Sequence, residues 1–273
     1  MKWSKEAEKT MERVPFFIRK MVRKKVESYA RQQGVQLIKN EHIEACRQKF
    51  MKSMDKELKG YSVETCLGAK GCSNRTLSDS ATAIVDEIEE ILQGLNMKEF
   101  LEKRLKHPLK VHNEFRVSIS FCPNSCSRPQ IVDVGFIGAV KPGVFQNECT
   151  MCGSCKEVCQ EKAIILHENA VEIREDKCLY CGHCIEACPT GAIQKEKEGF
   201  RILVGGKLGR HPQLGLELPG IFANEDAIKT FKKIALFYKD NCVNGERLGV
   251  IVAQKGHDFI IDEFSLPSPG EIK

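Results

Sequence analysis

Apolar residues recur at helical spacing through residues 4–58, which predicts a helical N-terminal segment. The clearest stripe begins at Pro15, which suits a first helical turn because its missing amide hydrogen would have no partner there. Asn40 is the expected N-cap of the next helix, and Gly60 ends the pattern. The stripe consists of Phe17, Ile18, Met21, Val22, Val26, Tyr29 and Ala30, and the next helix carries Ile43, Cys46 and Phe50.

Beyond the first sixty residues, both periodicities occur. Residues 81–92 repeat apolar side chains at helical spacing, whereas residues 115–120 alternate apolar and polar side chains as a half-buried strand does. Further strands are expected at residues 131–140 and 200–204, and a helix at residues 224–241. Because helices and strands are mixed, we expect an α+β fold.

A cysteine-dense unit, residues 143–196, interrupts this pattern, and its two halves repeat at an offset of 29 residues. We therefore expect residues 61–142 and 197–273 to form one domain into which this unit is inserted. Residues 1–60 are expected to form a separate helical segment.

The composition permits a sizeable core, since 42% of the 273 residues are hydrophobic and 29% are charged. No apolar run approaches the ~20 residues of a membrane span, and the first residues do not resemble a signal peptide, so we expect a cytoplasmic protein without a membrane partner. Residues 1–60 hold sixteen Lys/Arg against eight Asp/Glu, a balance of +8, so the other residues sum to −3. This segment favours an acidic partner or an anionic ligand over nucleic acid, for which no recognition motif is present.

The fourteen cysteines point to a specific chemistry. In a reducing compartment, so many cysteines indicate thiolate ligands of metals rather than disulfides. Twelve of them fall into three groups of four. The remaining two, Cys46 and Cys242, lie on apolar helical stripes and are expected to be small core residues.

Two of the groups repeat the C-x2-C-x2-C-x3-C ligand run of [4Fe–4S] clusters, in which the fourth cysteine binds the cluster of the other run. Zinc sites, the alternative, would favour separate C-x2-C pairs. Over about fifty residues this unit resembles bacterial two-cluster ferredoxins, with Gln160 at the position that corresponds to Pro189. The expected ligands are Cys149, Cys152, Cys155 and Cys188 for one cluster, and Cys178, Cys181, Cys184 and Cys159 for the other.

The third group combines a C-x5-C pair with a C-x3-C pair, and its four thiolates suit a third [4Fe–4S] cluster. The C-P-N-S-C-S-R-P-Q run of residues 122–130 resembles the sirohaem-binding region of sulfite and nitrite reductases, and so does the G-G-K-L-G-R-H-P run of residues 205–212. The resemblance covers about residues 61–255, and dissimilatory sulfite reductases are similar in carrying a ferredoxin insertion. The expected ligands are Cys66, Cys72, Cys122 and Cys126.

The resemblance implies sirohaem as a second type of cofactor, with Cys126 bridging the third cluster to the sirohaem iron. The macrocycle is rich in carboxylates, so its pocket needs cations and amide donors, and glycines such as Gly209 would let the backbone approach it. A solvated surface is the alternative for the basic residues. The expected catalytic residues are Arg75, Arg128, Lys207 and Arg210, and the expected cofactor-binding residues are Cys126, Asn124, Arg128, Gly205, Gly206, Lys207 and Arg210.

The N-terminal segment resembles the small C-terminal domain of a light-independent protochlorophyllide reductase subunit, on the W-S-K-E-A-E-K, R-V-P-F-F-I-R and E-S-Y-A-R-Q-Q-G runs. This implies a segment that covers a tetrapyrrole or mediates assembly, and a helical dimerisation module is the alternative. Sulfite reductases usually carry a further half-domain before the first cysteine pair, and it supplies basic residues to the substrate. Because residues 1–65 resemble something else, the substrate-binding residues stay open.

We therefore expect a sirohaem and iron–sulfur oxidoreductase that reduces sulfite to sulfide with six electrons, or else nitrite. The expected partners are a small oxyanion and a low-potential electron donor, such as a ferredoxin or a reductase subunit. A non-catalytic electron-transfer or cofactor-holding subunit, and a tetrapyrrole reductase, are the alternatives. The sequence leaves both a homo-oligomer and a hetero-oligomer open.

Overall fold

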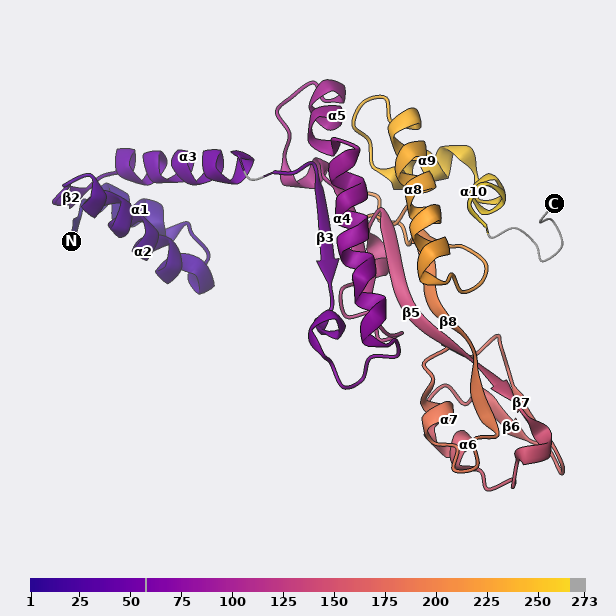
Figure 1. The fold of residues 1–273 in the computed structure, drawn as a ribbon. Coiled ribbons are helices and arrows are strands. Elements are labelled where there is room, and N and C mark those ends of the chain that lie inside the picture. The colour runs from indigo at the N-terminus through magenta and orange to yellow at the C-terminus, as the bar shows by residue number, and fades with distance from the viewer. Residues whose placement is uncertain (57, 266–273) are drawn as a thin grey trace. The chain divides into compact units, whose positions relative to one another are not determined.

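The computed structural model describes residues 1–56 and 58–265, and in residues 50–56 it describes the backbone only. The chain divides into two units, Met1–Leu58 and Lys59–Lys273, which are described separately (Figure 1). None of the helices in the described residues combines the length and the apolar character that crossing a membrane would require.

The N-terminal unit is a set of helices with a small core. Ser4 caps the first helix, since its hydroxyl oxygen accepts a hydrogen bond from the Ala7 amide at 3.2 Å. The core consists of Ala7, Val26, Ala30 and Ile38, with Ile43 and Cys46 packed against it. The elements are β1 (Lys2–Trp3), α1 (Lys5–Glu12), α2 (Phe16–Gln32), β2 (Leu37–Ile38) and α3 (Asn40–Lys56), with β1 parallel to β2.

Two expectations for this unit were wrong in detail. The stripe on α2 is only partly buried: Phe17 and Met21 are 74% and 53% exposed, because α1 and α3 cover only the face that carries Val26 and Ala30. Asn40 is the first residue of α3, and its side chain accepts a hydrogen bond from the Thr10 hydroxyl at 2.9 Å instead of capping the helix. The side chain of Phe50 lies outside the described residues.

The second unit is built on a five-stranded sheet in the order β3-β4-β5-β8-β9. The strands β3, β4 and β5 are parallel, and β8 and β9 are antiparallel to their neighbours. This mixed arrangement agrees with the expected fold class. The strands are β3 (Tyr61–Thr65), β4 (Phe115–Ser120), β5 (Val134–Val144), β8 (Ile193–Val204) and β9 (Leu216–Glu217).

Helices pack beside this sheet, with α4 and α8 next to each other (Figure 1). The helix expected at residues 224–241 is confirmed as α8, and Cys242 follows it as a buried core residue. The helices are α4 (Ile84–Gly94), α5 (Met97–Arg104), α8 (Asn224–Asn241), α9 (Leu248–Lys255) and α10 (His257–Phe264). Short 3₁₀ helices are η1 (Leu67–Lys70), η2 (Asp79–Ala83), η3 (Val111–Asn113), η4 (Pro129–Ile131) and η5 (Gln146–Glu148).

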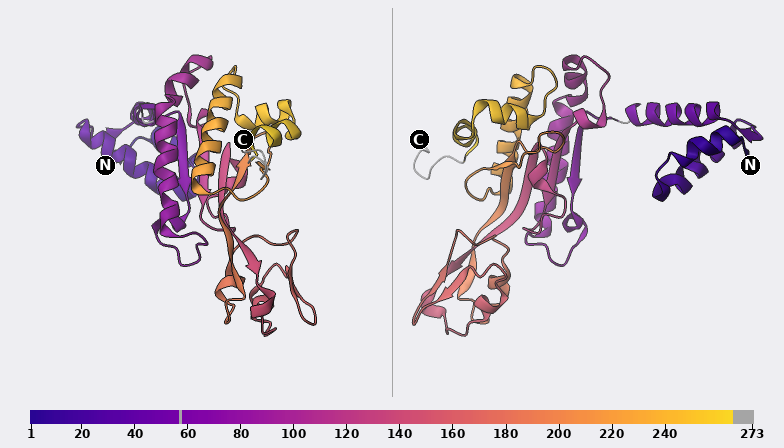
Figure 2. Two further views of the ribbon diagram at one scale, coloured as in Figure 1. Left: turned by 45° about the vertical axis from the view of Figure 1, so that its right-hand side comes forward. Right: turned by 180° about the vertical axis from the view of Figure 1, so that it is seen from behind.

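The strands β5 and β8 form a ribbon that is longer than expected. They pair from Val134 opposite Val204 to Val144 opposite Ile193, with a shift in register at Lys141 and Pro142. The sequence pattern did not predict the half of the ribbon beyond this register shift. The reason is that residues 195–198 are all charged and that a proline interrupts β5. Beyond the ribbon lie α6 (Ser154–Val158), β6 (Ile164–Leu166), β7 (Val171–Ile173) and α7 (His183–Glu186) (Figure 2).

A buried ion pair joins the sheet to α9. Asp133, directly before β5, is fully buried, and its carboxylate accepts hydrogen bonds from Arg247 Nε at 2.9 and 3.0 Å. It also accepts from the backbone amides of Arg116 at 2.8 Å and Leu248 at 3.1 Å. Arg247 Nη2 adds an ion-pair contact at 2.7 Å without the alignment of a hydrogen bond. One carboxylate therefore fixes β4, β5 and the start of α9.

We expect Asp133→Ala to lower the free energy of unfolding by about 3–5 kcal/mol, because it leaves the Arg247 charge buried without its partner. Urea unfolding of the cluster-loaded chain under anaerobic conditions, followed by near-UV circular dichroism, measures this. Asp176→Ala is the matched control, because its pair with Arg174 at 2.7 Å is exposed and should contribute little. Equal effects of the two substitutions would contradict the assignment.

Candidate metal centre

Parallel pairing of β3 and β4 brings two cysteines of the third group together. Cys66 directly follows β3 and Cys122 closely follows β4, and the register sets Thr65 opposite Ile119. The Cys66 amide continues the ladder by donating to Ile119 O at 3.1 Å, and the Phe121 amide donates to Cys66 Sγ at 3.4 Å. Both cysteine pairs therefore begin at the same edge of the sheet.

The remaining cysteines of this group complete the cluster of thiols. Burial raises the pKa of the Cys122 thiol, and three neighbouring thiolates raise it further. These neighbours are Cys66, Cys126 and Cys72. Gly68 permits the close approach of the first loop, since a Cβ there would lie 2.7 Å from Phe121 Cβ. The structure thus brings all four cysteines of the third group together.

Serines that the sequence analysis missed hold the second loop. The Ser118 hydroxyl donates to Ser127 O at 2.6 Å, and the Ser120 and Ser127 hydroxyls lie 2.7 Å apart. All three residues are buried. Ser118 and Ser120 alternate with apolar residues in β4, so the pattern placed them on a solvated face. The available signal was their position directly before the C-x3-C pair.

Cys126 differs from the other cysteines of its group in being exposed. Its sulfur accepts a hydrogen bond from Asn124 Nδ2 at 3.0 Å. The loop turns sharply around it, since Ser125 and Arg128 adopt left-handed backbone angles, with φ of 53° and 58°. The Cys126 sulfur therefore has one hydrogen-bond donor beside it and is otherwise accessible to solvent.

The cysteines of the other two groups also lie near one another. Burial raises the pKa of Cys184 to about 12, and the nearby thiolates of the same expected set raise it as well. These neighbouring thiolates are Cys178, Cys181 and Cys159. The cysteines of the first set, Cys149, Cys152, Cys155 and Cys188, line one small cavity.

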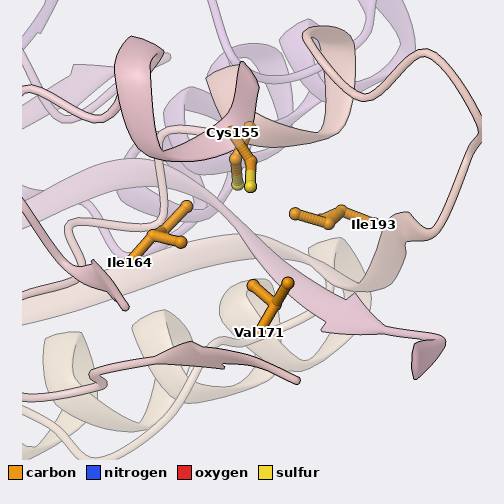
Figure 3. Close-up of a cluster of buried hydrophobic side chains, with 5 residues drawn as sticks. Cys155, Ile164, Val171 and Ile193 are labelled. Atoms are coloured by element: carbon orange, nitrogen blue, oxygen red, sulfur yellow. The ribbon is translucent and has the colours of Figure 1, made fainter. Parts of the chain in front are cut away.

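The two cysteine runs share their backbone conformation. Met151 and Tyr180 have φ of 57° and 59°, and Gly153 and Gly182 have φ of 84° and 82°, in each case at the offset of 29 residues. Cys155 of the first run points toward an apolar cluster that contains Ile164, Val171 and Ile193 (Figure 3).

The donor set fits iron–sulfur clusters. Each group offers four thiols, which is the ligand complement of a [4Fe–4S] cluster, with one thiolate at each iron. Among the described residues, no group of three or more His, Cys, Asp or Glu side chains has the geometry to hold a single metal ion. The buried thiols would have to lose their protons to bind iron, so cluster binding would release protons.

The basic candidates lie on three loops. Arg75 forms an ion pair with Asp79, and its Nη1 lies 3.5 Å from Gly68 O in the first cysteine loop. Arg128 is exposed two residues after Cys126. On the third loop, Lys207 Nζ donates to His211 O at 2.7 Å, and Arg210 is exposed.

The glycines of the third loop allow close packing against the neighbouring segment. The Gly205 amide donates to Asp133 O at 2.7 Å, so this amide already has a partner. A Cβ on Gly206 would lie 2.4 Å from Gln130 O. The Gly215 amide also donates to Gln130 O, at 2.8 Å. The third loop therefore lies against the segment that follows Cys126, which places the loops of Arg128 and Arg210 side by side.

Comparisons with known proteins cover both units. The family described as "Proto-chlorophyllide reductase 57 kD subunit" matches residues 3–47. One of the light-independent protochlorophyllide reductase subunits of Pelodictyon phaeoclathratiforme is 55% identical over 38 residues, which are 14% of this chain and 7% of that protein. This confirms the expected resemblance of the N-terminal unit.

Two sulfite reductase proteins match about half of the chain. The Coenzyme F420-dependent sulfite reductase of Methanocaldococcus jannaschii is 35% identical over 152 residues, which are 55% of this chain and 24% of that protein. One of the anaerobic sulfite reductase subunits of Salmonella typhimurium is 28% identical over 147 residues, 52% of this chain and 42% of that protein. The chain thus spans less than half the length of either relative.

A solved structure shares the fold. The crystal structure of dissimilatory sulfite reductase I superposes with a TM-score of 0.50 at 19% identity, over 81% of this chain and 58% of that chain. The family described as "Nitrite and sulphite reductase 4Fe-4S domain" matches residues 61–270, which is more than half of the chain. The protein therefore belongs to the nitrite and sulphite reductase 4Fe-4S domain family.

Proposed function

We propose that the protein binds sirohaem and three [4Fe–4S] clusters and reduces sulfite to sulfide with six electrons. The observation that carries the proposal is the gathering of four thiols at one sheet edge, with one of them, Cys126, open to solvent. When bound, the clusters would supply single electrons and sirohaem the iron at which the oxyanion is reduced. Sulfite is preferred to nitrite because both sulfite reductase relatives carry that name.

Within this proposal, Cys126 is the thiolate shared by cluster and sirohaem. A shared ligand must present its sulfur on two sides, and Cys126 is the exposed cysteine of its group. The Asn124 amide donates to this sulfur at 3.0 Å, which stabilises negative charge on it and fixes its direction. The less exposed Cys66, Cys72 and Cys122 would bind the cluster alone.

The basic candidates divide into two roles. Arg75 and Lys207 already have partners, Asp79 and the His211 carbonyl, so they position their loops. Arg128 and Arg210 are exposed on loops that lie side by side, and their planar guanidinium groups match carboxylate and oxyanion geometry. We assign these two to the macrocycle carboxylates and the substrate anion.

A second candidate function is electron transfer to a separate catalytic chain. It is favoured by the name of one of the relatives, which is a sulfite reductase subunit. In that case a low-potential donor and a partner chain would both bind this protein. The two candidates differ in whether sirohaem is present.

We expect about twelve cluster irons per chain, from three sets of four thiolates, and one further iron in sirohaem. Anaerobic iron and acid-labile sulfide analysis, together with an absorption spectrum of the extracted macrocycle, tests this. About eight irons, the content of two four-iron clusters, would contradict a cluster in the third group. A full set of clusters without a macrocycle would contradict the first candidate function and support the second.

We expect Cys126→Ser to abolish magnetic coupling between the haem iron and the adjacent cluster, because a serine oxygen is a poor bridge between irons. Sulfite reduction with any donor should fall with it. Cys66→Ser is the matched control, in which cluster damage should precede any loss of macrocycle. Mössbauer and EPR spectra of both variants, reduced in the same way, make the comparison. Wild-type coupling in Cys126→Ser would overturn the assignment and leave Cys122 as the next candidate.

A further inference from the structure

The second cysteine run contacts the segment that follows the first cysteine pair of the third group. The Thr76 hydroxyl donates a hydrogen bond to the Cys181 carbonyl at 3.1 Å, across 105 positions of sequence. Beside it, the Val140 amide of β5 donates to the Tyr180 carbonyl at 2.8 Å. Gly182 completes the contact, since a Cβ there would lie 3.7 Å from Val140 Cβ and 3.9 Å from Thr76 Cγ2.

Thr76 is also tied to the third group on its other side. It lies four residues after Cys72, and its amide donates to the Phe121 carbonyl at 3.0 Å. Phe121 directly precedes Cys122. A continuous path of bonds therefore runs from the Cys181 carbonyl through the hydroxyl and amide of Thr76 to the Phe121 carbonyl and on to Cys122.

The first cysteine run is placed differently. The lining of the cavity that contains its four cysteines comes only from residues 149–193. The set formed by Cys178, Cys181, Cys184 and Cys159 thus has a direct link to the third group through Cys181. Electron tunnelling falls off more slowly through bonded atoms and hydrogen bonds than through empty space. We therefore expect this link to increase the rate at which an electron reaches the third group.

We propose that Thr76 is a positioning residue for electron transfer, which links the second cysteine set to the third group through its two hydrogen bonds. This rests on the proposed function in requiring clusters at both groups. In the step, one electron leaves a reduced cluster held by the second set, which returns from the 1+ to the 2+ state. The cluster of the third group takes up that electron and passes from 2+ to 1+, and no proton moves. A low-potential donor supplies this electron beforehand by reducing the first set, from which the electron passes to the second set.

The test compares Thr76→Val, which keeps the shape and loses the hydroxyl, with Thr76→Ser, which keeps the hydroxyl. The full-length, cluster-loaded chain is photoreduced with a deazaflavin, and transfer to the third group is followed by rapid-freeze EPR in a single turnover. We expect Thr76→Val to slow this transfer several-fold and Thr76→Ser to stay near the wild type. Midpoint potentials and iron content should be unchanged in both.

Thr82→Val is the matched control, because the Thr82 hydroxyl also donates to a backbone carbonyl, that of Asp79 at 2.7 Å, but away from the junction. It should transfer electrons like the wild type. Wild-type transfer in Thr76→Val, or equal slowing by Val and Ser, would overturn the proposal. If Thr76→Val lost a cluster, Thr76→Ala would replace it, and equal rates in the Ala and Ser variants would also overturn it.

This measurement does not depend on sulfite reduction. A chain with three clusters but no macrocycle would fail as a sulfite reductase, and its transfer between clusters would still depend on Thr76. Conversely, an active enzyme with wild-type transfer in Thr76→Val would retain the proposed function and lose this inference. The two failures are therefore distinguishable.

Discussion

The parallel pairing of β3 and β4 is the constraint on which the candidate site depends. Parallel neighbours end at the same edge of a sheet, so Cys66 and Cys122, far apart in sequence, begin their loops side by side. The connection between the strands must cross over, and α4 and α5 lie within it. A one-residue slip would turn the β4 side chains to the opposite face and remove the buried Ser118 and Ser120 from the second loop.

The third parallel strand, β5, carries glycines where the segment around Cys122 packs directly against its backbone. A Cβ on Gly135 would lie 2.0 Å from the Pro129 carbonyl oxygen, and one on Gly138 would lie 2.6 Å from the Phe121 backbone. Both glycines therefore let the segment around Cys122 lie directly on β5. The same strand continues into the ribbon with β8, so one element supports the third cysteine group and also carries Val140, which binds the second cysteine run.

The sequence predicted features that depend on neighbouring residues, and it did not predict contacts between residues far apart in the chain. Spacing alone grouped the cysteines that the structure brings together, and helical periodicity gave α8 with its bounds. The buried Asp133 pair was not foreseen, because Arg247 is distant in sequence and a lone carboxylate has no periodic signal. The apolar stripe of α2 is less buried than its periodicity suggested, because periodicity shows that a helix face is apolar but not that another element covers it. The close packing of Gly205 and Gly206 was not foreseen, because glycine serves close packing as well as ligand approach and the sequence does not distinguish the two.

The acid–base state of the cysteines would couple the binding of the proposed clusters to the fold. Burial raises the pKa of Cys155, Cys178 and Cys184, so these thiols are harder to deprotonate than a free cysteine. The exposed Cys152 thiol has a lowered pKa, chiefly through its hydrogen bond with the Ser154 hydroxyl, so it is deprotonated more readily. If iron binds there, part of its binding free energy is spent on ionising these buried thiols, and only the remainder stabilises the loops around them.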